Sequence, residues 1–443
     1  MSRLASVLAD GTDRVVCFGR DGRERRAGEL MAVAAQVAAR LRDFDDERWA
    51  LNLDDSFDFT AALLGCWAAG RTAVLAPRPL LATLDSAAVD GVIEFAGDST
   101  VAASRIVFEE LAPSRQPLGA IVSSASLVLY TSGSTGTPKH THRRLVNVES
   151  ELSTLESVWG ANLLGARVYA TVSHRHVYGF LFRILWPLLS RRPFASFDFD
   201  YPEQLLGSVS DGNVLISSPA ILKRVGHLPA RSAQWRAVFS SGGFLPPDAA
   251  AHVARVLGVA AIEVYGSTET SGVAWRRASS ERFRLLPSVE ARAPDELLEV
   301  RSPFSGYEEW LAMGDRVTLR GDGTLELLGR ADRVAKIEDK RVSLSEIERR
   351  LLEHAYVEDA VAIALEDERR QYVGVVVELT VAGRTALLER GKRAVSMTLR
   401  GALRGRIDAV ALPRAYRYPT TIPVDAQGKR QLVALGELFA RKP

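Results

Sequence analysis

Two patterns of apolar and polar positions alternate along the chain, one with the spacing of helices and one with the short apolar runs of strands. Residues 27–41 and 57–69 repeat their apolar positions at helical spacing. Short apolar runs typical of buried strands lie at residues 214–216, 237–239 and 261–264, and each leads into a polar or glycine-containing segment. This alternation predicts an α/β fold in which helices pack on sheets, with the functional site outside the carboxyl ends of the strands.

The pattern changes after residue 331. Ser343 and Glu346 have the spacing of a capping box in front of a helix, and strand-like runs follow between residues 360 and 379. These elements predict a small α+β unit with its own core. We therefore expect a large N-terminal domain of residues 1–331 and a small mobile C-terminal domain of residues 332–443.

Composition excludes several classes of protein. The 56 Lys and Arg residues nearly balance 54 Asp and Glu residues, so no overall field would recruit nucleic acid or an anionic membrane. Cys17 and Cys66 are too few for a disulfide framework or a metal cluster, and we expect both to be small apolar side chains. The longest apolar stretch, residues 177–189, contains Arg183 and Pro187 and is too short for a membrane helix. We expect a cytoplasmic enzyme.

The segment YTSGSTGTPK at residues 130–139 follows the strand-like residues 126–129. Glycines that tolerate positive φ let successive amides converge on an anion, and the hydroxyl side chains add donors. A flexible surface linker has a similar composition. A Walker-type loop is excluded because its glycines lie further apart and its lysine follows glycine directly, whereas Lys139 follows Pro138. The segment predicts a loop that holds nucleotide phosphates.

Three further segments carry candidate chemistry. Glu269 in VYGSTET suits Mg²⁺ beside phosphates, although a carboxylate after a strand is more often in the first turn of a helix. The small residues of FSSGGFL at 239–245 would leave a slot for a flat ring. Asp315 in MGDR matches the two hydroxyls of a ribose, or it satisfies N–H groups in a turn.

Two segments supply candidate catalytic groups. SHRHVYGF at residues 173–180 holds two histidines beside aromatic residues, and His176 would line an acid-binding pocket unless it is a structural histidine. No set of ligands at zinc spacing and no G-x-S-x-G elbow accompanies it. Lys429 in IPVDAQGKR would stabilise negative charge developing on phosphate and carboxylate oxygens, or it is a solvated loop lysine.

In this order, YTSGSTGTPK, YGSTE, GDR, GRADRVAKI and the late GK resemble the adenylate-forming (ANL) superfamily of acyl- and aryl-CoA synthetases, peptide-synthetase adenylation domains and luciferases. The resemblance spans most of the chain. It implies that a carboxylate attacks the α-phosphorus of ATP, which gives an acyl-AMP and pyrophosphate. A phosphopantetheine thiol then takes the acyl group and releases AMP.

The resemblance also implies a set of site residues. The ATP phosphates would lie against Thr131, Ser132, Gly133, Ser134, Thr135 and Gly136, and the rest of the nucleotide against Gly242, Gly243, Tyr265, Gly266, Ser267, Thr268, Asp315 and Arg330. The acid pocket would contain His176, Tyr178, Ser217, Ser241 and Gly242. Glu269 would bind Mg²⁺, Asp332 would be the hinge, and Lys429, Glu269 and His176 would act in catalysis.

Three features depart from the family pattern. HTHRR follows Lys139 directly, residues 336–341 lack the usual glycine, and the stretch between Ala76 and Ser126 is short. This compact form is most similar to acid:acyl carrier protein ligases, including 4-hydroxybenzoate-activating members of aryl-polyene-type pathways. The cations near residues 336–350 would be either a basic face for an acidic carrier protein or the solvated side of a helix.

We therefore expect a ligase that adenylates a small carboxylic acid, with an aryl acid such as 4-hydroxybenzoate favoured, and loads it on an acyl carrier protein. Free CoA is the alternative acceptor, and an inactive nucleotide-binding homologue is the third hypothesis. An amino acid is disfavoured, because the SHRHVYGF segment offers no carboxylate for its ammonium group. The expected partners include no nucleic acid and no transmembrane segment, and the protein would be a monomer or a homodimer.

Overall fold

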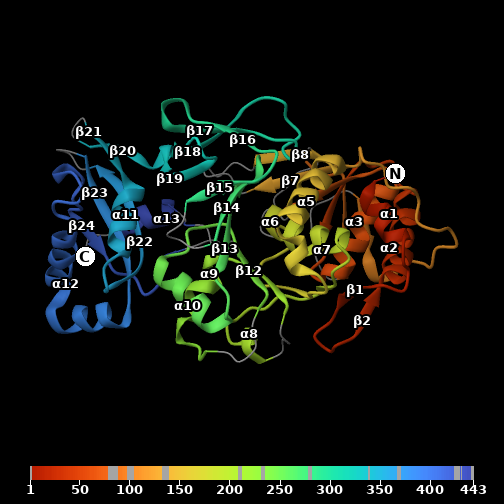
Figure 1. The fold of residues 1–443 in the computed structure, drawn as a ribbon, viewed down its shortest axis with the longest axis horizontal. Coiled ribbons are helices and arrows are strands. Elements are labelled where there is room, and N and C mark those ends of the chain that lie inside the picture. The colour runs from red at the N-terminus through yellow and green to blue at the C-terminus, as the bar shows by residue number, and fades with distance from the viewer. Residues whose placement is uncertain are drawn as a thin grey trace. The chain divides into compact units, whose positions relative to one another are not determined.

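The computed structural model separates the chain into two compact units (Figure 1). It describes residues 2–77, 88–96, 104–131, 139–207, 212–230, 235–277, 282–337, 340–366, 371–423, 430 and 432–440. The large unit contains residues 1–291 and 300–311, and the small unit contains residues 292–299 and 312–443. Residues 312–331 are thus grouped with the small unit, and the proposed domain boundary after residue 331 stays a prediction.

The first sheet of the large unit has the strand order β6-β5-β3-β4-β7-β8. Its strands are β3 (Arg48–Asn52), β4 (Thr72–Leu75), β5 (Gly91–Glu94), β6 (Ser104–Val107), β7 (Ser126–Thr131) and β8 (Lys139–Arg144). The first five run in parallel, and β8 pairs antiparallel with β7. The strand expected at residues 126–129 is confirmed as the first four residues of β7, which leads directly toward the expected phosphate loop.

Two helices that the apolar spacing predicts pack against each other beside this sheet. They are α2 (Ala27–Leu41) and α3 (Ser56–Ala68). Asp55 is the N-cap residue of α3, and its carboxylate accepts from the N–H of Phe57 at 2.8 Å. Gly65 lets the two helices approach closely, because a Cβ there would lie 2.6 Å from Cβ of Val37. Cys17 and Cys66 are both buried free thiols, and burial raises the pKa of each.

Nine consecutive strands of a second, larger sheet lie in the large unit, in the order β15-β14-β13-β12-β11-β9-β10-β1-β2. These strands are β1 (Val15–Phe18), β2 (Glu24–Arg26), β9 (Val168–Ala170), β10 (Phe194–Ala195), β11 (Val214–Ser217), β12 (Ala237–Ser240), β13 (Ala261–Ser267), β14 (Ser271–Arg276) and β15 (Phe283–Leu285). The central strands from β1 to β13 are parallel, whereas β2, β14 and β15 are antiparallel. The three strands expected near residues 214, 237 and 261 are confirmed as β11, β12 and β13.

Helices bury the apolar side chains of this second sheet. Besides α2 and α3, helical segments of the large unit include α1 (Arg3–Ala9), α5 (Leu145–Trp159), α6 (Val177–Gly179), η3 (Phe180–Leu185), α7 (Trp186–Leu189), α8 (Gln204–Gly207), α9 (Pro219–Leu222) and α10 (Pro247–Leu257). Val253 and Val256 of α10 pack with Leu215 of β11 and Val238 of β12. Phe239, the next residue of β12, instead lies 5.1 Å from the ring of Trp159 on α5. Successive side chains of β12 therefore alternate between two covered faces.

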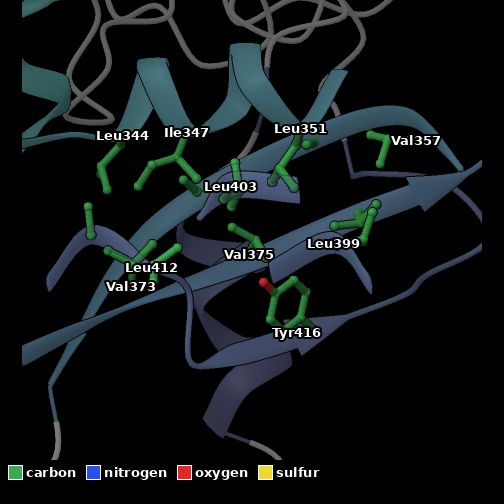
Figure 2. Packing of buried hydrophobic residues seen from close by; sticks show 14 of the residues in the cluster. Leu344, Ile347, Leu351, Val357, Val373, Val375, Leu399, Leu403, Leu412 and Tyr416 are labelled. Atoms are coloured by element: carbon green, nitrogen blue, oxygen red, sulfur yellow. The ribbon is translucent and has the colours of Figure 1, made fainter. Parts of the chain in front are cut away.

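The small unit has its own core (Figure 2). Its elements are β18 (Leu311–Leu319), β19 (Thr324–Arg330), β20 (Val334–Ile337), β21 (Lys340–Ser343), α11 (Leu344–Leu352), β22 (Val357–Glu366), β23 (Gln371–Leu379), α12 (Val381–Leu403), β24 (Ala415–Arg417) and α13 (Leu432–Ala440). Leu344 and Ile347 of α11 face the sheet strand β23, and Leu399 of α12 belongs to the same cluster. Ser343 caps α11 by accepting from the N–H of Glu346 at 3.2 Å, as the capping-box spacing predicts.

None of the helices in the described part of the chain is both long and apolar enough to cross a bilayer. The apolar run at residues 177–189 forms α6, a π-helical segment and α7 inside the large unit. Arg183, which interrupts this run, is 1% exposed and pairs with Asp198.

Candidate active site

The strand β7 ends where the expected phosphate loop begins. In the antiparallel pair β7–β8, Thr131 lies opposite Lys139, so the hairpin closes between these two residues. Residues 132–138 lie outside the described residues, and so do the side chains of Thr131 and Lys139. The phosphate contacts expected for Ser132, Gly133, Ser134, Thr135 and Gly136 therefore remain predictions.

Glu269 lies in a tight turn between β13 and β14. The hydroxyl oxygens of Ser267 and Thr270 are 3.0 Å apart, and each hydroxyl also accepts from the other residue's N–H, at 3.2 and 3.1 Å. Gly266 is required here, because a Cβ would lie 2.1 Å from the carbonyl oxygen of Ser271. The alternative that Glu269 begins a helix is wrong, since two strands flank the turn.

The Glu269 carboxylate is exposed at this turn. Among the described residues no group of three or more His, Cys, Asp or Glu side chains is arranged to hold a metal ion. Mg²⁺ is commonly held by only one or two carboxylates, with phosphate oxygens and waters as its other ligands. A single accessible carboxylate fits such an ion, and bound Mg²⁺ would neutralise charge on the ATP phosphates.

Three residues expected in the acid pocket, Ser217, Ser241 and Gly242, lie at the carboxyl ends of β11 and β12. Ser217 ends β11 beside Ser240 of β12, and its hydroxyl oxygen lies 2.8 Å from that of Thr171. Ser241 donates its hydroxyl to the carbonyl of Val264 at 2.8 Å, which joins the end of β12 to β13. Gly242 follows with φ of 87°, a conformation that favours glycine.

Tyr178 closes this region from α6. Burial raises the pKa of its hydroxyl well above the ordinary value, and the backbone of Ser217 partly offsets that effect. Its ring lies 4.9 Å from Phe182, whose ring is 5.5 Å from Phe239. Phe182 and Phe239 are 2% and 0% exposed, so these two rings belong to the buried core behind the strand ends, while hydroxyl groups line the strand ends themselves.

The two histidines of SHRHVYGF have different environments. His174 is 2% exposed, and its ring nitrogens contact Ser56 Oγ at 3.1 Å and the carbonyl of Leu53 at 3.0 Å. Burial is the main cause of its strongly lowered pKa, so this imidazole is neutral and structural. His176 is only partly buried and precedes α6, which leaves it as the histidine available to the acid pocket.

Three other residues expected to bind the nucleotide lie in strands, one in the large unit and two in the small unit. Tyr265 is in β13 of the large unit, with its ring 5.8 Å from Phe283. In the small unit Asp315 and Arg330 are opposite each other in β18 and β19, with Nη1 and Oδ2 3.8 Å apart. The turn alternative for Asp315 is wrong, because this residue lies within β18.

The expected hinge and catalytic lysine adjoin one charged network of the small unit. Asp332 lies in a short 3₁₀ turn, and the next residue, Arg333, pairs with Glu348. Lys429 lies outside the described residues. Arg430, which follows it, donates to Glu348 Oε2 at 3.2 Å and to Asp359 Oδ1 at 2.6 Å.

Sequence reasoning missed two buried charged residues behind the Glu269 turn. Arg143 donates to the carbonyl of Thr268 at 2.6 Å, and Glu151 accepts from the N–H of Gly272 at 2.9 Å. The sequence signal for them is weak, because β8 reads KHTHRR and α5 also contains Glu149 and Glu156. That signal does not identify a partner more than 100 residues away.

Taken together, a strand leading into the glycine- and hydroxyl-rich segment and an exposed carboxylate turn define a nucleotide-using α/β enzyme. The family model described as AMP-binding enzyme matches residues 112–303. A 4-coumarate–CoA ligase of Halorhodospira halophila is 30% identical over 325 residues, which cover 70% of this chain and 75% of the relative. Another, from Rhodobacter capsulatus, is 28% identical over 70% of this chain and 76% of the relative.

Solved structures agree on the fold. The ATP-bound MatB of Rhodopseudomonas palustris superposes with a TM-score of 0.83 at 19% identity, over 99% of this chain and 98% of that one. A benzoate CoA ligase of Burkholderia xenovorans gives 0.81 at 19% identity, over 98% and 100%. The chain belongs to the AMP-binding, adenylate-forming enzyme family. It is an ATP-dependent, AMP-forming acid–thiol ligase that works through an acyl-AMP.

Proposed function

We propose that this ligase activates an aromatic carboxylic acid and transfers it to the thiol of CoA. The observation that carries the acid class is the partly buried ring of Tyr178 beside the hydroxyl-lined ends of β11 and β12. Flat aromatic rings stack favourably on such a ring. Two of the curated relatives are 4-coumarate–CoA ligases, which supports the same class.

The sequence favours an acyl carrier protein as the acceptor and leaves free CoA as the alternative. We favour CoA instead. The similar ligases named above use CoA, and ligation to a carrier protein has no such support. The basic face expected near residues 336–350 is also largely neutralised where its side chains are described. Lys340 pairs with Asp408 at 2.9 Å, and Arg349 and Arg350 pair with Glu346 on their own helix. This pairing favours the solvated-helix alternative.

In this proposal the site residues divide the work. The loop after β7 would hold the ATP phosphates, and Glu269 would bind Mg²⁺ at the turn after β13. Asp315 and Arg330 would bind the ribose, and Lys429 would stabilise the charge that develops as the carboxylate attacks the α-phosphorus. His176, Tyr178, Ser217, Ser241 and Gly242 would surround the acid.

The test measures the thioester product by mass spectrometry. The enzyme is incubated with ATP, Mg²⁺ and 4-coumarate, 4-hydroxybenzoate, benzoate or a fatty acid, and with either CoA or a phosphopantetheinylated carrier protein. We expect an aryl-CoA thioester from at least one aromatic acid. A product only on the carrier protein would overturn the proposed acceptor, and a product only from fatty acids would overturn the acid class.

A further inference from the structure

Arg143 is a buried charge with no role in the site described so far. It lies in β8, opposite Leu127 of β7, and is only 3% exposed. Its guanidinium donates through Nη2 to the carbonyl of Thr268 at 2.6 Å, and through Nη1 to the carbonyl of Phe304. Burial lowers its pKa, and Glu151, Tyr307 and Glu269 partly offset that effect. Both contacts are to backbone of the large unit.

The carbonyl of Thr268 is part of the peptide group that ends at the nitrogen of Glu269. This group is planar, so fixing its oxygen also fixes the direction in which the Glu269 backbone begins. A guanidinium is a rigid fork, and here it joins two carbonyls at once. Arg143 therefore orients the peptide group from which the Glu269 side chain departs.

Glu151 of α5 holds the other end of the same turn. Its Oε1 accepts from the N–H of Gly272, and it is buried so completely that burial raises its pKa. Ser271, between these anchors, has φ of 61°, which is costly for a residue with a Cβ and persists only where neighbours fix the backbone. Two charged side chains thus hold the turn on both sides of Glu269.

We propose that Arg143 is a positioning residue for the Mg²⁺ site. It orients the Thr268–Glu269 peptide, and it connects that turn to β8, the strand that follows the expected phosphate loop. The inference rests on the proposed function, in which Glu269 binds the ion. Outer partners of metal ligands commonly change metal affinity by about 10- to 100-fold.

The test is a Mg²⁺ titration of the binding of a fluorescent ATP analogue, with no acid or thiol present. Arg143→Lys keeps the charge but loses the fork that reaches two carbonyls. We expect the Mg²⁺ concentration at half-maximal binding to rise about tenfold. Saturating Mg²⁺ should restore nucleotide binding, because the phosphate loop itself is unchanged.

Arg192→Lys is the matched control. Arg192 is also 3% exposed and donates to two carbonyls, those of Leu163 at 2.8 Å and Gly160 at 2.9 Å, away from the Glu269 turn. We expect this variant to lose stability while the Mg²⁺ midpoint stays at the wild-type value. An equal midpoint for Arg143→Lys, Arg192→Lys and wild type would overturn the positioning role.

Two further variants keep the result interpretable. If Arg143→Lys does not fold, Glu151→Gln weakens the other anchor of the turn. This variant should also raise the Mg²⁺ concentration at half-maximal binding, by a smaller factor. An unchanged Mg²⁺ midpoint in Glu151→Gln would count against the proposal. Glu269→Gln tests the proposed function itself. If Glu269→Gln shifts the Mg²⁺ midpoint and Arg143→Lys does not, only the positioning role of Arg143 is overturned. If Glu269→Gln causes no shift, both the Mg²⁺ site at Glu269 and the positioning role of Arg143 are overturned.

Discussion

Glu348→Gln should weaken the small unit beside the expected hinge and catalytic lysine. The Glu348 carboxylate accepts from the N–H of Ala362 at 2.9 Å and pairs with Arg333 and, at 3.2 Å, with Arg430. Its side chain is 12% exposed, against 17% for Arg333 and 31% for Arg430. Removing one partner of a buried ion pair costs about 3–5 kcal/mol, and the partial exposure of Arg430 favours the lower end, about 3 kcal/mol.

Amide hydrogen exchange in β22 measures this loss locally, since Ala362 lies in that strand. A loss of about 3 kcal/mol corresponds to exchange about a hundredfold faster wherever opening of this unit controls exchange. Glu353→Gln is the control, because Glu353 pairs with Arg349, Arg350 and Arg406 but is 37% exposed. Such a pair contributes less than about 1 kcal/mol. Equal acceleration in the two variants would refute the reasoning.

Three further predictions concern single residues of the large unit. Burial raises the pKa of Asp58 from 3.8 to about 6, so the folded state binds this proton more tightly and is penalised above that pH. Asp58→Asn should therefore stabilise by about 1–2 kcal/mol at pH 7.5, after allowance for partial exposure, and the gain in urea titrations should vanish as the pH falls from 6 toward 4. Gly179→Ala would place a Cβ 2.1 Å from the carbonyl oxygen of Ser173, so we expect at least about 2 kcal/mol of lost stability in the same titrations. Tyr178→Phe should lower kcat/KM for hydroxylated aromatic acids about fivefold relative to unsubstituted ones, the effect of one hydrogen bond, and equal losses for both would argue against a hydroxyl contact.

Local patterns predicted local structure well. The apolar spacing of residues 27–41 predicts the bounds of α2, and the runs near residues 214, 237 and 261 lead to three adjacent parallel strands. Both faces of these strands are covered by other elements. An uninterrupted run of apolar residues is therefore the sequence pattern expected for them. The small residues that follow them are also where the candidate acid pocket lies.

Long-range partners could not be predicted in the same way. Arg143 and Thr268 are separated by 125 positions, and no periodicity relates a buried arginine to the carbonyl it binds. The helix alternative for Glu269 failed because the pairing of β14 with β13 continues the sheet beyond the turn. The sequence predicts a role only for His176, and the contacts of His174 with Ser56 and Leu53 identify it as structural.

The measurement that tests the central claim most directly is acid-dependent exchange of labelled pyrophosphate into ATP. It reports formation of the acyl-AMP without requiring any thiol acceptor. We expect exchange with at least one aromatic carboxylic acid and a loss of at least about a hundredfold in Lys429→Ala, the size typical for a group that stabilises transition-state charge. Absence of exchange with every aromatic and fatty acid tried would contradict the account, and exchange unchanged in Lys429→Ala would remove that lysine from the mechanism.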